Sequence, residues 1–431
     1  MDTGDSGRAT PLARRTLAKV ERRLLPLLFL MYGAVLLVRA NVGLAALQMR
    51  EDLGFSATVF GLGGGIFILG YSSFAVPSNL ILARTGARRW IAPILILSGG
   101  IGAAMTLVEG PLSFYGLRFL LGVAEAGFFP GIIYYLSRWM PAAQRARPVA
   151  LFMAAIPATG VVSGLLASVL FKLEGQLGLA GWEWLFLVEG VPAVLLGGVA
   201  FYALTDDPAH ARWLTGEERA WLIEQLQGER ASVARPRAWR LRDALADRTL
   251  WRLSLLTFLM LTGGHAYGLW APQLIQGMMD LSDSQVSLVT SGIAAASVLA
   301  MLINAAHSDR WQERRLHVAI PAFITALGWL LCLRIHSGAA GVIALGLIAV
   351  GGNSLYGPFW AWPHDSPAAA ASAGRIALIV AIGSVGGFIG PNLVGLTKDL
   401  TGSYDVAFLV LGVMALGAAL LAVAVRPLQR G

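Results

Sequence analysis

The stretch LLPLLFLMYGAVLLVRANVGLAAL spans Leu24–Leu47 and decides the class of this protein. A helix that crosses a bilayer needs about 20 mostly apolar residues. The run is long enough for one crossing, and it exceeds the roughly 7–15 apolar residues of a signal-peptide core. It therefore predicts a retained membrane helix that follows a polar, basic segment at residues 1–23.

Apolar runs of similar length recur along the chain and predict an all-α integral membrane protein with twelve transmembrane helices. The expected spans are residues 25–47, 58–80, 91–108, 113–136, 148–171, 184–204, 249–274, 287–307, 317–336, 340–362, 375–397 and 406–425.

A polar stretch interrupts this series after the sixth span. It contains WLTGEERAWLIEQLQGER (Trp213–Arg230), which predicts an amphipathic helix. The expected organisation is an amino-terminal six-helix bundle at 1–204, a cytoplasmic central loop at 205–248 and a carboxy-terminal six-helix bundle at 249–431.

The composition agrees with a membrane protein. Hydrophobic residues make up 56% of the chain and charged residues 13%, whereas soluble proteins are roughly 45–50% apolar and about 25% charged. These values exclude a disordered chain and a collagen-like fibre, and they argue against a soluble enzyme. The single cysteine, Cys332, excludes an intramolecular disulfide.

The net charge of +8 is explained by the position of the basic residues. With the amino terminus inside, inner segments hold 25 of the 33 Lys and Arg residues, and outer loops hold three. Cytoplasmic loops of membrane proteins carry such an excess. The pattern predicts a multi-pass protein of the inner (cytoplasmic) membrane with both termini in the cytoplasm.

One basic loop follows the second span of each half. These loops are SNLILARTGARRW (Ser78–Trp90) and NAAHSDRWQERRLH (Asn304–His317). Internal repeats are typical of secondary transporters, whose substrate sites lie between the halves. Two unrelated inner loops that are basic only because of their side of the membrane remain the alternative. In the first interpretation, the loops stabilise an inner gate through Arg84, Arg88, Arg89, Asp309, Arg310, Arg314 and Arg315.

Four longer motifs resemble the anion:cation symporter family of the major facilitator superfamily. They are RFLLGVAEAGFFPGIIYYLSRWMP (Arg118–Pro141), GWEWLFLVEGVPAVLLG (Gly181–Gly197), GPFWAWP (Gly357–Pro363) and IGSVGGFIGPNLVGLTKDLTGSY (Ile382–Tyr404). The resemblance implies two six-helix bundles related by a pseudo-two-fold axis, which move by alternating access. It also implies import of organic carboxylates such as sugar acids, tartrate or phthalate, commonly with protons.

Arg118 and Glu125 are charges within the fourth span, where charged residues are functional candidates. Seven residues are about two helical turns, so both lie on nearly one face. Arg118 offers a permanently charged fork that suits a carboxylate, and Glu125 is the expected proton carrier. A buried ion pair that only holds helices together is the alternative.

Arg39 and Asn41 lie late in the first span, where the family pattern resembles Tyr-x-Asp-Arg-x-Asn. Here Leu36 replaces the Tyr and Val38 replaces the Asp. The resemblance implies that Arg39 and Asn41 help to bind the anion, although Arg39 could also reach only the membrane interface. Without the Asp, the cavity has two arginines against one carboxylate, which favours an anion and leaves Glu125 as the evident proton site.

Other positions bear on the substrate. Val380 lies where sugar-acid members carry an Asn, and Leu36 also removes a polar group, so the sequence favours an aromatic or aliphatic mono- or dicarboxylate over a polyhydroxy acid. Tyr71 and Trp360 remain at family positions and could line the site, or they could simply pack between helices. A sugar-acid symporter remains an alternative.

Three residues of the carboxy-terminal half have two interpretations each. His265 and Tyr267, in TGGHAYGLWAP, could serve the site, with His265 as a second titrating group, or could pack within the seventh span. Arg375 could reach the cavity or simply mark the inner side of the eleventh span. Glu189, in the sixth span, is interpreted as a gate or packing residue rather than a substrate ligand.

The remaining expectations concern motifs that the sequence lacks, the partners of the protein and alternative functions. The chain has no phosphate-binding loop, metal-ligand spacing or nucleophile motif, so we expect no enzyme activity, cofactor or metal. The expected partners are a small organic anion, a proton and the lipid bilayer, with no nucleic acid and a monomeric state. Because of Val38, an uncoupled facilitator or an anion exchanger remains open, and a membrane sensor that binds an anion without moving it is a rival from another class.

Overall fold

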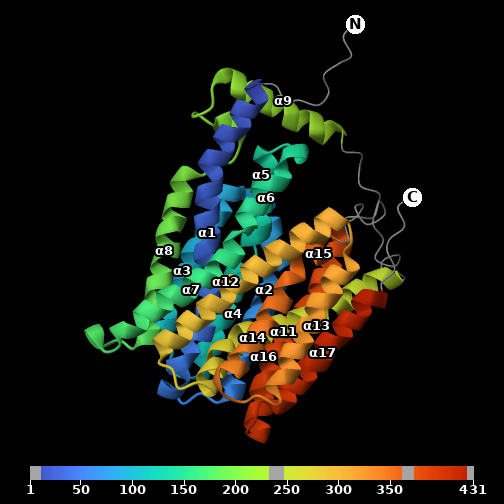
Figure 1. Cartoon of the computed structure of the whole chain (residues 1–431). Coiled ribbons are helices and arrows are strands. Elements are labelled where there is room, and N and C mark those ends of the chain that lie inside the picture. Colours follow the sequence, from blue (N-terminus) through green and yellow to red (C-terminus); the bar gives the residue numbers. More distant parts are fainter. Residues whose placement is uncertain (1–10, 233–246, 362–372, 425–431) are drawn as a thin grey trace.

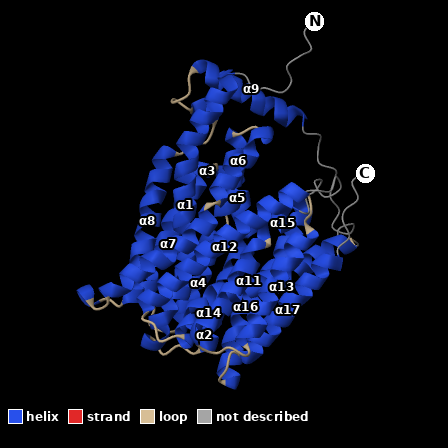
Figure 2. Cartoon of the chain, viewed as in Figure 1, coloured by secondary structure: helices blue, strands red, loops and turns tan. Residues whose placement is uncertain are grey.

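The computed structural model describes residues 11–232, 247–361 and 373–424, and the regular elements in these ranges are all helices (Figure 2). The all-α class is therefore confirmed. The membrane helices and their connections are α1 (Pro11–Asp52), α2 (Ala57–Thr85), α3 (Ala87–Ala104), η1 (Met105–Leu107), α4 (Pro111–Glu125), α5 (Phe128–Trp139), α6 (Ala142–Met153), α7 (Ala155–Leu170), η2 (Phe171–Leu173), η3 (Gln176–Gly178), α8 (Gly181–Ala203), η4 (Pro208–His210), α9 (Gly216–Ser232), α11 (Arg248–Met278), α12 (Asp283–Trp311), α13 (Arg315–Cys332), α14 (Gly338–Ser354), α15 (Tyr356–Ala361), α16 (Ala373–Thr401) and α17 (Asp405–Ala424).

Eleven stretches of the described chain are long and apolar enough to cross a membrane. The remaining predicted span, 249–274, corresponds to α11, which has 31 residues. It falls outside that set because its middle turns contain Thr262, two glycines and His265 and are therefore less apolar.

Large apolar side chains on the outside of the helices support the membrane assignment. Val76 is 69% exposed, Ile303 is 70% exposed and Leu420 is 64% exposed. A soluble protein rarely leaves so much apolar surface in water, whereas lipid tails cover it without cost. The chain is therefore a multi-pass membrane protein.

The fourth predicted span is two helices rather than one. Helix α4 ends at Glu125, and α5 begins at Phe128 after Ala126 and Gly127. A Cβ at Gly127 would lie 1.8 Å from the Ser78 hydroxyl oxygen, so only glycine allows α2 to approach here. This break places Glu125 at the end of a helix in the middle of the span.

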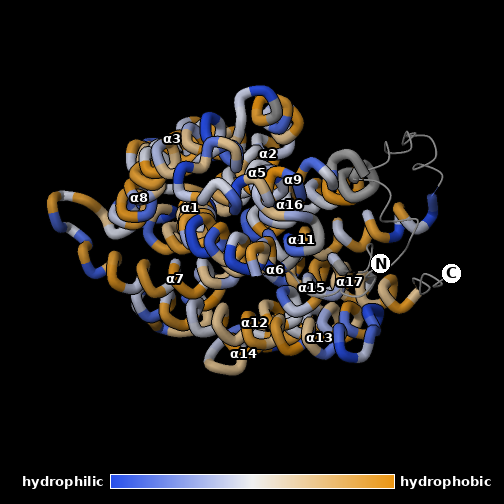
Figure 3. The backbone as a smooth tube through the Cα atoms, turned by 90° about the horizontal axis from the view of Figure 1, so that it is seen from above, coloured by the Kyte–Doolittle hydropathy of each residue, from blue (hydrophilic) through white to orange (hydrophobic). Residues whose placement is uncertain are grey.

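The helices form two groups. Helices α1 to α8 lie on one side of the molecule and α11 to α17 on the other, with the described amino-terminal end and α9 at the top of Figure 1. Viewed from that end, α2 lies beside α16 and α7 lies beside α12 (Figure 3), and these pairs are in extensive contact. The two groups therefore meet along two seams.

The groups are joined at the helix ends that lie away from the amino terminus. Arg50 at the end of α1 donates to Gln273 of α11 at 2.5 Å, and Gln48 donates to Asp283 of α12 at 3.0 Å. The backbone N–H of Thr58 donates to Asp399 at 2.7 Å. We call these contacts, together with the glycine contacts described next, the interbundle seal.

Glycines allow close backbone contact at the seal. A Cβ on Gly43 would lie 2.8 Å from the Gly268 carbonyl oxygen, and one on Gly61 would lie 2.6 Å from the Pro391 carbonyl oxygen. Real Cβ atoms do not approach backbone oxygens so closely, so each of these positions requires glycine to keep the two groups in contact. Within the described residues, the hydrogen bonds that join the two groups all lie toward this end.

The amphipathic helix predicted in the central polar stretch is α9. Its first turn is capped by Thr215, whose hydroxyl accepts from the Glu218 N–H at 3.3 Å, while Glu218 accepts from the Thr215 N–H at 2.9 Å. Lys19 of α1 donates to the same Glu218 carboxylate at 2.8 Å. This contact holds α9 against the amino-terminal extension of the first membrane helix.

Candidate functional site

The buried face of α4 places two charges in the middle of the amino-terminal group. Phe114, Arg118, Leu121, Gly122 and Glu125 are its buried residues, and they recur at spacings of three and four as on one helix face. A Cβ at Gly122 would lie 2.1 Å from the Phe67 carbonyl oxygen, so glycine lets this face press against α2.

Glu125 is fully buried and binds two other helices. The Nε–H of Arg39 on α1 donates to its Oε2 at 2.8 Å, and the Ser98 hydroxyl on α3 donates to its Oε1 at 2.9 Å. The side chain of Arg39 is 31% exposed, whereas that of Glu125 is 0% exposed. Arg39 therefore connects a sealed carboxylate to accessible space.

Arg118 lies beside this pair. It is 3% exposed, and its Nε–H donates to the Gly63 carbonyl oxygen at 3.2 Å. The Phe67 ring lies 4.9 Å from the Arg118 guanidinium and 5.2 Å from that of Arg39. The Tyr71 ring also lies 5.2 Å from the Arg39 guanidinium, so aromatic faces support both cations.

The cluster has unequal charges. Glu125 forms an ion pair with Arg39, and Arg118 forms none with the described acidic residues. Two guanidiniums and one carboxylate leave one positive charge in a setting where isolated charges are costly. Chemically, the arrangement can bind one carboxylate group with a planar cation and can exchange a proton at Glu125 against the bond to Arg39.

Val38, at the position where the family pattern has an Asp, is part of an apolar cluster. It is 1% exposed and packs with Ala34, Phe67 and Leu121. A Cβ on Gly102 would lie 2.5 Å from its side chain, so the side chain fills the space between α1 and α3. The described residues thus place no second carboxylate in contact with Arg39.

The two candidate site residues on α11, His265 and Tyr267, lie in different environments. His265 contacts the Leu261 carbonyl oxygen through Nδ1 at 3.0 Å. Tyr267 packs edge-on against Trp329 with ring centres 6.5 Å apart. It also borders a cavity of about 110 Å³ among α11, α13, α14 and α17, which Thr325, Asn353 and Tyr356 line as well.

The other substrate candidates are not gathered around the arginines. Trp360 packs edge-on against Phe359 at 5.0 Å in an apolar cluster of the carboxy-terminal group, and Val380 is 39% exposed. Asn41 is fully buried and lies against Glu189. The side chain of Arg375 lies outside the described residues. The roles of these residues in binding stay predictions.

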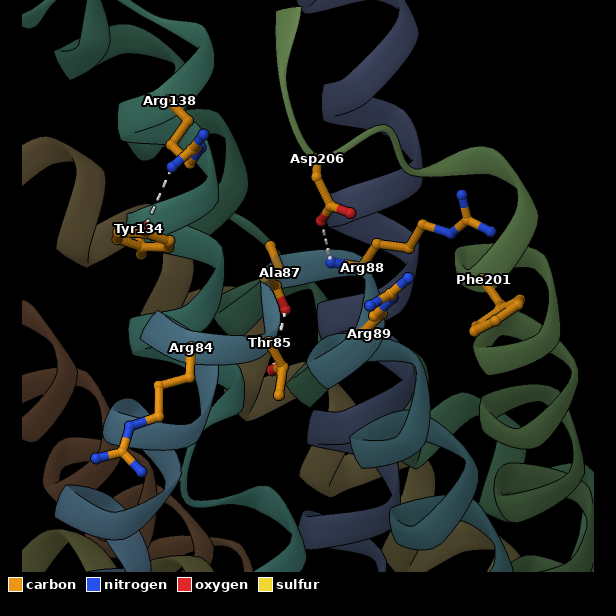
Figure 4. A pocket seen from close by; sticks show the side chains of 10 residues that line it. Arg84, Thr85, Ala87, Arg88, Arg89, Tyr134, Arg138, Phe201 and Asp206 are labelled. Carbon is orange, nitrogen blue, oxygen red and sulfur yellow. Dashed lines mark hydrogen bonds between the residues drawn. The ribbon is translucent and has the colours of Figure 1, made fainter. Parts of the chain in front are cut away.

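The basic loop between α2 and α3 borders a pocket of about 430 Å³ at the amino-terminal end (Figure 4). Arg84, Arg88, Arg89 and Arg138 surround it, and the Arg88 N–H donates to Asp206 at 2.8 Å. Arg138 forms an ion pair with Asp207 at 2.5 Å. The pocket is separate from the Arg39–Glu125 pair. The hydrogen bond to Asp206 connects the loop to the segment that follows α8.

The corresponding loop after α12 has its own polar contacts. Arg314 forms an ion pair with Asp309 at 2.6 Å, Arg315 donates to the Val423 carbonyl oxygen, and Arg310 is exposed. Partial burial would raise the pKa of Glu313, but hydrogen bonds from the Leu316 N–H and from His317 lower it below its ordinary value. Both loops are therefore held by acidic partners, although the gating role stays a prediction.

Sequence reasoning missed Ser98, Phe67 and Gly63 as neighbours of the charged cluster. Ser98 lies in an ordinary apolar run and Phe67 among small residues. Neither position has a pattern that distinguishes it from helix packing, so only the tertiary structure identifies them.

Comparisons with known proteins agree with this architecture. The profile of the Major Facilitator Superfamily matches residues 28–391. A putative tartrate transporter of Agrobacterium vitis is 45% identical over 91% of this chain and 90% of its own. A quinolone resistance transporter of Acinetobacter baumannii is 35% identical over 91% of each chain. The xylose transporter XylE of E. coli, in a partially occluded inward-open conformation, superposes with a TM-score of 0.73 at 15% identity, covering 94% of this chain and 99% of that one.

Proposed function

The chain belongs to the major facilitator superfamily, a family of transporters rather than enzymes, and on that premise we propose that it imports an organic carboxylate together with a proton. The observation that carries the proposal is the cluster of Arg118 beside the Arg39–Glu125 ion pair. A buried cation without a carboxylate partner supports this proposal, because it can accept the carboxylate of a substrate.

The substrate class follows from the cluster and from the relatives. Two guanidiniums suit a dicarboxylate better than a monocarboxylate, and the A. vitis relative is named for tartrate. We therefore propose a short aliphatic dicarboxylate of the tartrate type as the leading substrate. Aromatic carboxylates are the second class, because Phe67 and Tyr71 present ring faces beside the arginines.

The ion pair supplies a coupling step. While Glu125 is ionised, it competes with the substrate for Arg39. When Glu125 takes up a proton, the charge-assisted hydrogen bond weakens and Arg39 becomes free to donate to the substrate carboxylate. The proton and the anion then bind cooperatively, as a symporter requires.

The orientation in the membrane is part of the proposal. The excess of basic residues supports a cytoplasmic position of the amino-terminal end. In that orientation the interbundle seal closes the outer side, which corresponds to an inward-facing conformation. In this proposal, the gate loops at Arg84–Arg89 and Asp309–Arg315 contact each other in the outward-facing state.

The first test is a thermal-melt panel with tartrate, phthalate and galactonate. A ligand at a hundred times its dissociation constant stabilises by about 2.7 kcal/mol. Tartrate should give the largest shift. A shift with galactonate alone would replace the dicarboxylate by a sugar acid, and no shift with any of them would remove the carboxylate assignment.

The second test is uptake of labelled tartrate into proteoliposomes with and without an inward proton gradient. Uphill uptake that requires the gradient supports symport. A facilitator, which the apolar Val38 favours, would only equilibrate tartrate, and an exchanger would require an anion inside. Tartrate that leaves the vesicles against its gradient would indicate export, a direction raised by the relative named for quinolone resistance.

A further inference from the structure

A second carboxyl group lies in the amino-terminal helices without a charged partner. Glu189 on α8 is 2% exposed, and neither of its carboxylate oxygens has a hydrogen bond. The described residues offer it no ion pair either. An ionised carboxylate in such a position would be very costly.

Asn41 of α1 is the polar group that faces Glu189. Its side chain is 0% exposed and is a neighbour of the Glu189 carboxyl group. Its amide nitrogen and oxygen nevertheless have no hydrogen-bond partner. Two adjacent buried polar groups that are all unsatisfied form a site that can rearrange. An amide supplies both a donor and an acceptor, so it can meet either form of a carboxyl group.

The charged groups on the elements that pack against α8 are directed elsewhere. On α1, Arg39 binds Glu125 and Arg50 binds Gln273. The arginines of α3 are Arg88 and Arg89 in its first turn, about 16 Å along the helix from Gly99, which contacts α8 at Gly190. Helix α7 has no ionisable residue, and Lys172 lies beyond it in η2.

Asn41 is also connected to the seal between the two groups. It lies two residues before Gly43, whose Cα faces the Gly268 carbonyl oxygen of α11. When the seal opens, this turn of α1 loses its neighbour on α11. The Glu189–Asn41 pair therefore lies within one helical turn of a contact that belongs to the seal.

We infer that Glu189, together with Asn41, is a second proton-binding site, loaded when the seal is open and closed off when the seal forms. The inference rests on the proposed proton symport. It gives Glu189 on α8 the proton-binding role that the family pattern places on α1, where this chain has Val38. The step is a protonation followed by release: the Glu189 carboxylate takes a proton from water on the seal side, the carboxyl group donates to the Asn41 amide oxygen, and the proton leaves to water on the opposite side, which restores the carboxylate for the next cycle.

The decisive measurement is the infrared spectrum of the purified protein in lipid, because a protonated carboxyl group has a C=O stretch separate from that of carboxylates. Wild type should show this band near neutral pH, and Glu189→Gln should lack it. The matched control is Glu183→Gln, because Glu183 lies on the same helix and accepts from the Ala180 N–H; this variant should keep the band. A spectrum of Glu189→Gln equal to that of wild type overturns the inference.

The second measurement is the number of protons moved per substrate, from the pH dependence of the reversal potential in proteoliposomes. Glu189→Gln should move one proton fewer than wild type and keep its tartrate thermal shift. An unchanged proton number, or transport that responds to sodium instead, overturns the inference. The infrared assay needs no transported substrate, so it reports on Glu189 even if the uptake assay rejects proton symport.

Discussion

Arg39 on α1 donates to Glu125 on α4 at 2.8 Å, across a sequence separation of 86 residues. The pair joins a partly accessible cation to a carboxylate that has no exposed surface. Because the Ser98 hydroxyl on α3 donates to the other carboxylate oxygen, Glu125 links its own helix α4 to α1 and α3. A change in its protonation would therefore alter the contacts among these three helices.

The first prediction concerns Glu125. Glu125→Gln should move one proton fewer per tartrate and sharply reduce uphill uptake driven by a proton gradient while tartrate counterflow persists, because glutamine mimics the protonated acid and keeps the shape of the site. Uphill uptake and a proton number at the wild-type level would show that Glu125 carries no transported proton. Glu109→Gln, at the start of the loop before α4, is the matched control and should behave as wild type.

The second prediction concerns Arg118. Arg118→Lys keeps the charge but removes the planar fork, and it should weaken tartrate binding about 10–100-fold, since a charge-assisted hydrogen bond contributes roughly 1.5–3 kcal/mol. Arg118→Ala should remove the tartrate thermal shift entirely. The exposed Arg252 at the start of α11 provides the control, and Arg252→Ala should bind as wild type. Equal affinities in all variants would exclude Arg118 from the site.

Part of this cluster could be predicted from the sequence. The seven-residue spacing of Arg118 and Glu125 fixes their common helix face, and the family resemblance pointed to Arg39. The partners of these residues could not be predicted, because Ser98 and Phe67 are ordinary residues of apolar helices until α2, α3 and α4 are packed together. For Glu189 the sequence favours a gate or packing role, because its lack of hydrogen-bond partners depends on burial that no local pattern reveals.

The same limit applies to the fold. Hydrophobic run length predicted the number of spans and the position of α9, since both depend on local composition. It did not predict the break at Gly127, where the approach of Ser78 from another helix requires glycine. The interbundle seal was also missed, because it consists of hydrogen bonds and close backbone contacts between residues more than 200 positions apart.

The third prediction concerns pH and the contact between α1 and α9. The hydrogen bond from Lys19 holds the pKa of Glu218 below its ordinary value of 4.5. A lowered pKa in the folded state stabilises the protein above the unfolded-state value, and this stabilisation is lost as the pH falls through the folded-state value. Glu218→Gln should lower the Tm by roughly 2 °C at pH 7, and the difference from wild type should shrink below about pH 4.5.

The control for this prediction is Glu217→Gln. Glu217 lies in the same first turn of α9 but is exposed, so its removal should leave the Tm nearly unchanged at either pH. A difference between Glu218→Gln and wild type that stays constant between pH 7 and pH 4 would mean that the carboxylate charge does not hold α9 in place.

The fourth prediction concerns the seal. Gly61→Ala adds a Cβ that would lie 2.6 Å from the Pro391 carbonyl oxygen, so α2 and α16 must separate and the population should shift toward a state with an open seal. A cysteine at Leu269, which is 7% exposed, should then react faster with a water-soluble maleimide than in the parent protein. The native Cys332 is buried and adds little background. Gly198→Ala is the matched control, because its Cβ has no neighbour within 4 Å. Slower or equal labelling in Gly61→Ala, with Gly198→Ala as the reference, would show that close packing at Gly61 does not hold the seal closed.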